Sequence, residues 1–248
     1  METLSRRTMA DAAGRPVLSY VEGTRAGRPY ADLVEVLGPG APGLILREMP
    51  GWVVSGDEEL GRRLIEAGGR PLRHAHGLSR DLRADPAPPG WAETGHGVVA
   101  CEAVPPAEVF PAWRAAYPPG HPDRDRGDDA TVLRETLTPL LSGASYGPLL
   151  PCGGLLLHDQ RVVAGVMVGR LRGEPPFGGP WILDVFRDPR PPFAGLGTVM
   201  LRRALALATL HGLPALGLAV TDGNPARRLY ERLGFRLVQS SITVTVPG

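Results

Sequence analysis

The sequence contains no lysine, so all 27 basic residues of its 248 are arginines. Without a lysine amine, the chain cannot form a Schiff base, and no P-loop lysine can reach a nucleotide γ-phosphate. Acidic residues number 26 and balance the arginines. That balance argues against the basic face that dominates nucleic-acid binding, so we expect no nucleic-acid partner.

Cysteines and long apolar runs are also scarce. Cys101 and Cys152 are too few for a disulfide framework, which indicates a reducing compartment, and without a histidine motif they are expected to be buried spectators. Residues 1–16 lack the apolar segment of a secretory signal. No run approaches the roughly 18 apolar residues of a membrane helix. We expect a cytoplasmic protein without a membrane partner.

Glycine and proline are abundant, at 33 and 27 residues, and they mark loops between apolar segments. The main Pro/Gly-rich stretches are residues 84–96, 118–129 and 173–180. We interpret the first as a linker. The sequence therefore predicts two domains, a smaller N-terminal lobe at 1–90 and a larger domain at 91–248.

Periodicity after residue 96 predicts an α/β order of strand, helix, helix, three strands, helix, strand, helix, strand. These elements are expected at 97–104, 106–117, 131–141, 154–171 (a hairpin), 181–186, 197–210, 214–220, 224–233 and 235–246. Residues 239–241 are a candidate bulge or turn within the last strand. This order predicts a sheet of mixed direction flanked by helices, rather than a strictly alternating dinucleotide-binding domain.

Residues 57–72 align with 222–237 at an offset of 165, with seven of sixteen residues identical. A diverged duplication and coincidence both explain the match, because Arg/Leu/Glu helices resemble each other easily. In a duplication, Ile65 stands where Tyr230 does, and Glu59 where Asn224 does. The Gly38–Gly40 turn lies too close to residue 59 for a long helix plus a strand between them.

A candidate anion site follows the strand that ends at Asp188. Gly195-Leu196-Gly197 opens the next helix, where glycines allow close backbone approach and the helix terminus offers unpaired N–H groups. A dinucleotide fingerprint would require a third glycine where Met200 stands, which disfavours that class.

A second motif lies 27 residues after Gly197, and together the two resemble the GCN5-related N-acetyltransferase (GNAT) family. The matching residues are Pro189, Gly195 and Gly197 in the first motif, and Asn224, Ala226, Leu229, Tyr230, Gly234 and Phe235 in the second. The resemblance extends over residues 97–248. It implies a mixed, mostly antiparallel sheet and makes the N-terminal lobe a candidate degenerate, catalytically inactive partial repeat.

The resemblance implies an acyl-CoA cosubstrate, most simply acetyl-CoA. Pro192 replaces the family's Arg/Gln, Phe193 follows it, and neither Pro191 nor Pro192 has an N–H to offer. Binding of the pyrophosphate then depends on the amides that follow. The coenzyme residues implied are Val185, Phe186, Arg187, Ala194, Gly195, Leu196, Gly197, Thr198, Asn224 and Tyr230.

The family chemistry implied is direct transfer of the acyl group to an amine, most simply of a small molecule. A backbone N–H of strand 185–188 would stabilise the oxyanion, and Tyr230 would protonate the leaving thiolate. A protein N-acetyltransferase and a non-catalytic acyl-CoA-binding or interaction module are the alternatives. The protein is expected to be a monomer or a homodimer.

The general base is open at this stage. The acid that many family members carry is replaced by Trp181, and Asp184 lies on the same strand with the other parity. Asp184 is the leading candidate. Asp188, Glu135 and His158 are alternatives, as is proton loss through ordered water.

Two further clusters raise the question of metal binding. His74 and His76 share one face of an expected strand, but no third ligand is evident nearby in the sequence, so a surface strand is the preferred interpretation. The loop aspartates lack the spacing of a calcium loop. They are Asp123, Asp125, Asp128 and Asp129. We expect no metal, and a solvated loop near the acceptor pocket that attracts a cationic amine.

Overall fold

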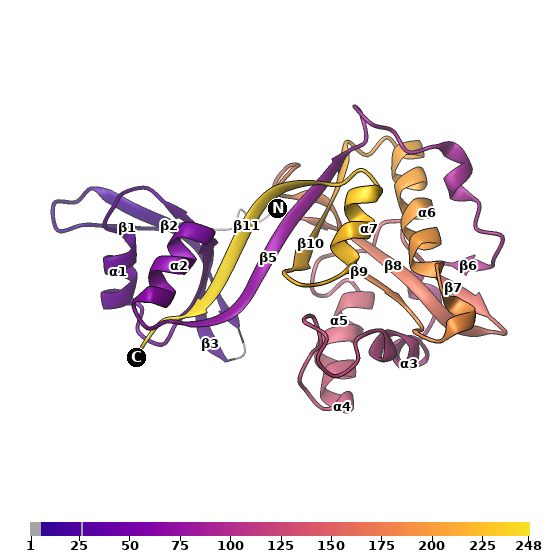
Figure 1. Cartoon of the computed structure of the whole chain (residues 1–248), viewed down its shortest axis with the longest axis horizontal. Helices are drawn as coiled ribbons and strands as arrows, with labels where there is room; N and C mark the ends of the chain where they lie inside the picture. The colour runs from indigo at the N-terminus through magenta and orange to yellow at the C-terminus, as the bar shows by residue number, and fades with distance from the viewer. Residues whose placement is uncertain (1–5, 26) are drawn as a thin grey trace. The chain divides into compact units, whose positions relative to one another are not determined.

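The computed structural model describes residues 6–25 and 27–248 and forms two compact units. Unit 1 contains Met1–His76 and Gln239–Gly248, and unit 2 contains Gly77–Val238. Two long neighbouring strands, β5 (Arg70–Asp81) and β11 (Arg236–Thr245), each contribute residues to both units (Figure 1).

The boundary predicted at residue 90 instead falls after His76, because the second half of β5 belongs to unit 2, beside β10. The last residues of the chain, from Gln239 on, belong to unit 1. The expected linker 84–96 packs in unit 2 instead. Ala87 is buried in the core, its N–H donates to Thr209 Oγ1 at 3.1 Å, and Trp91 lies beneath Arg202, 5.1 Å from its ring centre.

Unit 1 is a three-stranded antiparallel meander extended by further strands. The meander is β1 (Arg6–Ala10), β2 (Pro16–Arg25) and β3 (Arg28–Val36), followed by α1 (Ala41–Glu48), β4 (Val53–Asp57) and α2 (Glu58–Glu66). β4 pairs parallel to β3, and β11 pairs antiparallel to β4, with Ser241 opposite Asp57. Residues 239–241 continue this strand, so the turn that was one expectation there is not formed.

Unit 2 has the predicted element order. Its elements are η1 (Pro89–Ala92), β6 (Val98–Val99), η2 (Cys101–Ala103), α3 (Pro106–Ala116), helical segments α4 (Asp129–Val132), η3 (Leu133–Leu137) and α5 (Thr138–Leu141), then β7 (Gly154–His158), β8 (Arg161–Leu171), β9 (Gly179–Arg187), η4 (Pro191–Phe193), α6 (Leu196–Leu210), β10 (Ala215–Thr221) and α7 (Ala226–Arg232). The strand expected at 97–104 is shorter, since a 3₁₀ turn follows it. Strands β6 to β9 are antiparallel neighbours, and β9 pairs parallel to β10.

Helix α6 shows why the sequence signals were informative. Met200, Leu201, Ala204, Leu205 and Ala208 recur at helical spacing and are all buried in the core. Residues 191–210 reach a mean hydropathy of 1.3, and by length and composition alone this is one helix of the described residues that could span a membrane. Its apolar face is instead occupied by the sheet.

The two units repeat one order of elements. In unit 1 the series runs from β1 to β5, and in unit 2 it runs from β7 to β11. Both series begin with two antiparallel pairings and continue with a parallel one. The aligned segments 57–72 and 222–237 fall on the equivalent helix and strand starts. The sequence left too few residues between Gly40 and residue 59 for a long helix and a strand. Both elements fit because α1 has only eight residues, whereas its counterpart α6 has fifteen.

Candidate functional site

The site of interest lies where β9 and β10 stop pairing. Between these two strands, Trp181 pairs with Gly217 and Ile182 pairs with Leu218. Among the described residues, β9 and β10 form no pairs after Ile182 and Leu218. A Cβ at Gly217 would lie 2.2 Å from the Trp181 ring, so glycine allows this close approach. Past Ile182, β9 has an edge without a strand partner.

Backbone alternation identifies the peptide groups on that edge. The Asp188 N–H donates to Val163 O at 2.7 Å, and Arg187 and Val185 lie opposite Ala164 and Val166 on β8. In an antiparallel pair, residues alternate between facing the partner and facing away. The peptide groups of Val185 and Arg187 therefore face the open edge, where the Val185 carbonyl accepts from the Tyr117 hydroxyl at 3.4 Å.

The same alternation turns the peptide groups of Phe186 toward β8, and its side chain is buried. Phe186, predicted as a coenzyme residue, therefore has no backbone group on the open edge.

The anion loop is formed by residues 194–198, before and within the first turn of α6. Gly195 adopts a φ of 86°, the left-handed conformation that glycine allows without strain. Among the described residues, the N–H groups of Gly195, Leu196 and Gly197 have no acceptor, as expected at a helix N-terminus. The three amides can receive an anion together.

Two of the predicted amides in this loop are already used. Ala194 N–H donates to Pro191 O at 3.1 Å, and Thr198 N–H donates to Gly195 O at 2.9 Å. Of the five loop residues expected to contact the coenzyme, the central three therefore keep their donors.

The proline pair that precedes the loop forms the 3₁₀ turn η4, and Phe193 packs into the core. Arg190 donates to both carboxylate oxygens of Asp188, from Nε to Oδ1 at 2.9 Å and from Nη2 to Oδ2 at 2.7 Å. Its guanidinium also stacks over the Phe193 ring. This ion pair lowers the pKa of Asp188. Asp188 therefore acts as an anchor of the loop and is a poor candidate for the base.

Tyr230 projects from α7 and is 6% exposed. No hydrogen-bond partner of its hydroxyl is found among the described residues, and those residues include no fully buried side-chain polar atom without a partner. The hydroxyl must therefore reach accessible space. Burial, together with the negative charges of Asp184 and Asp123, raises the pKa of Tyr230. The phenol keeps its proton at physiological pH.

Asp184 faces α3 and accepts two hydrogen bonds. The Tyr117 hydroxyl donates to Oδ1 at 2.6 Å, and Trp113 Nε1 donates to Oδ2 at 2.9 Å. Burial raises the pKa of Asp184 to about 6, although both donors and the peptide N–H of Val185 favour the ionised form. The carboxylate is therefore ionised at neutral pH, with a basicity suited to accepting a proton.

Asp123 brings the 118–129 loop to the same place. Its carboxylate accepts from the Thr221 hydroxyl at the end of β10 and from Asn224 Nδ2, the latter at 2.8 Å. Asn224 Oδ1 in turn accepts from Ala226 N–H at 2.9 Å. The Asn224 side chain, which was expected to contact the coenzyme, thus forms hydrogen bonds with this loop and with the start of α7.

The other loop aspartates have separate partners and do not converge on a calcium site. Asp125 accepts from Gly127 and Thr136, Asp128 caps α4, and Asp129 pairs with Arg114. The alternative bases also lie elsewhere: Glu135 is exposed beside Arg134, and His158 is exposed beside Asp159. Asp184 is therefore the candidate base that shares the environment of Tyr230.

The comparisons with known proteins are consistent with this geometry. The family model described as "Acetyltransferase (GNAT) family" matches residues 108–235, just over half of the chain. The protein belongs to the GNAT acetyltransferase family. No curated protein matches the chain.

Solved structures of this family share the fold at low sequence identity. A GCN5-related N-acetyltransferase from Sphaerobacter thermophilus has a TM-score of 0.59 at 17% identity, covering 95% of this chain and 79% of its own. A GNAT-family acetyltransferase from Colwellia psychrerythraea has a TM-score of 0.55 at 12% identity, covering 96% and 84%. A tandem GNAT protein from the clavulanic acid biosynthesis pathway has a TM-score of 0.58 at 14% identity, covering 95% and 80%.

Two aromatic residues of this GNAT site were missed by the sequence reasoning. Trp113 lies on α3 and Tyr117 directly follows the last residue of that helix, and both donate to Asp184. Their four-residue spacing was visible in the sequence. Their target was not, because Asp184 lies 67 residues beyond Tyr117.

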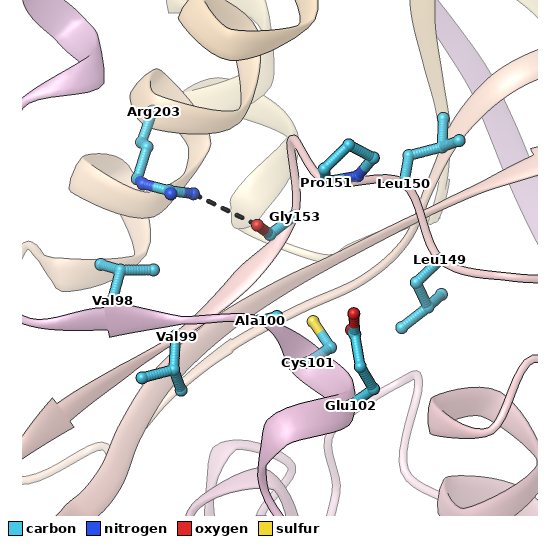
Figure 2. Close-up of a pocket in the computed structure, with 10 residues that line it drawn as sticks. All are labelled: Val98, Val99, Ala100, Cys101, Glu102, Leu149, Leu150, Pro151, Gly153 and Arg203. Atoms are coloured by element: carbon cyan, nitrogen blue, oxygen red, sulfur yellow. Dashed lines mark hydrogen bonds between the residues drawn. The ribbon is translucent and has the colours of Figure 1, made fainter.

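A separate pocket of about 270 Å³ lies at the other edge of the GNAT sheet, beside β6 (Figure 2). Arg203 reaches into it from α6 and donates to Gly153 O at 3.2 Å. Cys101 also lines it, and burial raises the pKa of this thiol to about 12, which makes it unreactive. No lining residue comes from β9, β10 or α7, so this pocket is not part of the site described above.

Unit 1 lacks the corresponding chemistry in its described residues. Its α2 carries Ile65 where α7 carries Tyr230, and Ile65 packs against the core of unit 1. Residues 6–25 and 27–57 also supply no counterpart of β6 and the α3–α5 helices, which in unit 2 provide Trp113 and Tyr117.

Proposed function

We propose that the protein is an acyl-CoA-dependent N-acyltransferase, most simply an acetyltransferase, that acts on the amine of a small molecule in the cytoplasm. The observation that carries this proposal is the Tyr230 hydroxyl. It has no hydrogen-bond partner among the described residues and shares its environment with the carboxylates of Asp184 and Asp123. Membership of the family supplies the reaction class.

The residues present fit an acyl-CoA. The unpaired amides of Gly195, Leu196 and Gly197 at the N-terminus of α6 suit a pyrophosphate. The peptide groups of Arg187 on the open edge suit the amides of a pantetheine arm, which would pair along β9 as an added strand; the Val185 carbonyl there accepts a long hydrogen bond of 3.4 Å from the Tyr117 hydroxyl. When bound, the coenzyme supplies the acyl thioester.

Each catalytic residue has a defined task in this proposal. Asp184 takes the proton from the attacking amine while the new C–N bond forms. An open peptide N–H of β9 stabilises the oxyanion, and Tyr230 donates a hydrogen bond and then its proton to sulfur as the C–S bond breaks. Protons and electrons balance without a metal or a second cofactor.

The charges favour a cationic amine as the acceptor. Asp184 and Asp123 both act on Tyr230, so two carboxylates lie in its environment. An ammonium acceptor would first lose one proton to solvent and attack as the neutral amine, and Asp184 would take the second proton as the C–N bond forms.

The test is release of free thiol from a panel of acyl-CoAs, each combined with small-molecule amines and with peptides. Replacing Tyr230 with phenylalanine should lower kcat by about 10²–10⁴-fold while coenzyme affinity is retained. Tyr146→Phe is the matched control, since Tyr146 is an exposed tyrosine of the same unit.

Three outcomes would contradict the proposal. Coenzyme binding without thiol release from any pair favours the non-catalytic module. Turnover with peptides alone favours a protein N-acetyltransferase. Full turnover by the Tyr230→Phe variant removes the tyrosine from the mechanism.

A further inference from the structure

A cluster of metal-ligating side chains lies in unit 1 and includes none of the residues of the proposed reaction. Glu58 on α2 and His74 and His76 on β5 present one ligand atom each, all within 4.8 Å of one another. His74 Nε2 lies 2.9 Å from Glu58 Oε1, and the two imidazole rings are 4.7 Å apart. The histidine pair of the sequence thus acquires the third ligand that it lacked.

The fold brings these groups together for local reasons. Asp57 caps α2, so Glu58 is the first residue of the helix. His74 and His76 are alternate residues of one strand and share a face of the sheet. Gly61, one turn along α2, allows the helix to pack closely on β11, since a Cβ there would lie 2.4 Å from Ile242.

Ser240 on β11 supports the cluster. Its hydroxyl lies 2.8 Å from His76 Nδ1 and is also hydrogen-bonded to Glu58. His76 is itself buried, at 5% exposed. Such partners orient ligating side chains in metal sites, and their loss typically weakens binding by about 10–100-fold.

The ligand set selects the kind of ion. Two imidazoles and one carboxylate suit zinc, with a water as the fourth ligand, and they are poor ligands for calcium or magnesium. Bonds of about 2.0–2.1 Å in tetrahedral geometry place the ligands about 3.4 Å apart. Side-chain rotations that move each ligand atom by about 1 Å would bring the three atoms to that spacing.

We propose that Glu58, His74 and His76 bind one divalent transition-metal ion, with zinc as the physiological choice. The ion joins the start of α2 to β5 and so stabilises the unit that lacks a catalytic tyrosine. Its role is structural, and the proposed acyl transfer does not depend on it.

The experiment uses the full-length protein, stripped with a chelator and dialysed. Zinc is then titrated in competition with a chromophoric chelator, and the melting temperature is recorded across the titration. We expect one zinc per chain and a melting temperature that rises with the logarithm of zinc concentration once the site is saturated. Cobalt substituted for zinc should show the visible absorption of a four- or five-coordinate ion.

Matched variants locate the site. Glu58→Gln should weaken zinc binding by at least 10-fold. Glu59→Gln, the adjacent exposed glutamate in the same helical turn, should not change it. His74→Gln should likewise weaken binding, whereas His96→Gln in unit 2 should not. Ser240→Ala should lower zinc affinity by about 10–100-fold.

Retention of zinc affinity by both Glu58→Gln and His74→Gln would place any binding elsewhere and overturn the proposal. Absence of saturable one-to-one binding by the unaltered protein would do the same. Glu58 is partly exposed and its replacement is isosteric, so this variant remains informative if a substitution at buried His76 prevents folding.

Discussion

Replacing Tyr117 with phenylalanine tests whether Asp184 is the base. The substitution removes a 2.6 Å hydrogen bond to Asp184 Oδ1 and keeps the ring against Trp113 and His121. A hydrogen bond to a charged group contributes about 1.5–3 kcal/mol, and one pKa unit corresponds to about 1.36 kcal/mol. The bond favours the ionised carboxylate, so its loss should raise the pKa of Asp184 from about 6 to about 7–8.

The assay is the pH dependence of kcat/KM for thiol release. Asp184 has to be ionised to accept a proton, so activity falls on the acidic side as it becomes protonated. In the Tyr117→Phe variant this acidic limb should move upward by about one to two pH units. Activity at a pH well above the new limb should stay near that of the unaltered enzyme.

Trp113→Phe provides an independent check, because it removes the 2.9 Å bond to Oδ2 and should move the same limb in the same direction. Tyr146→Phe should leave the limb in place. An acidic limb that stays put in both Tyr117→Phe and Trp113→Phe, or that moves downward, would refute Asp184 as the base whose pKa controls turnover.

Three further predictions concern stability. Burial raises the pKa of Asp184 in the fold above its ordinary 3.8, so its contribution to stability should be lost as pH rises from about 4 through about 6, and Asp184→Asn should remove this loss; the difference in unfolding free energy between pH 5 and pH 7 should be about 1–1.5 kcal/mol smaller in the variant, and an unchanged difference would contradict the shift. Gly195→Ala should lower the free energy of unfolding by about 1–2 kcal/mol, since a side chain there meets no atom within 4 Å and pays only for the left-handed backbone; a loss near zero in denaturant titration would contradict this reasoning. Deletion of residues 1–90 should give insoluble protein, because it removes the strand that carries Leu78 and Arg80 beside β10; a soluble, fully active fragment would show that unit 2 folds without it.

Much of unit 2 could be predicted from local patterns. The hairpin turn of β7 and β8 was visible as polar residues between two apolar runs, and Asp159 and Gln160 take the positive φ angles that such a tight turn requires. The start of α6 followed from its glycines, and its end from His211 and Gly212. These features are decided by interactions within a few residues of chain.

The domain boundary could not be predicted in this way. Proline and glycine in residues 84–96 indicate loop structure, and a loop that packs against α6 has the same composition as an exposed linker. Which strand completes which sheet is also invisible to periodicity. The alternating pattern of β11 would be the same if the strand stayed in unit 2, so the pattern does not reveal that β11 continues into unit 1 and pairs with β4.

The sequence by itself determined the family resemblance, the order of elements from residue 97 onward, the anion loop at Gly195–Gly197 and Tyr230 as the candidate acid. Each is a short motif or a local period. Tertiary structure alone decided that Tyr117 and Trp113 hold Asp184, that Asp123 joins Asn224, and that Glu58 meets His74 and His76. The physical reason is the same in each case. These partners lie 16 to 101 residues apart, and only the pairing of strands and the packing of helices on them brings such residues within hydrogen-bonding distance.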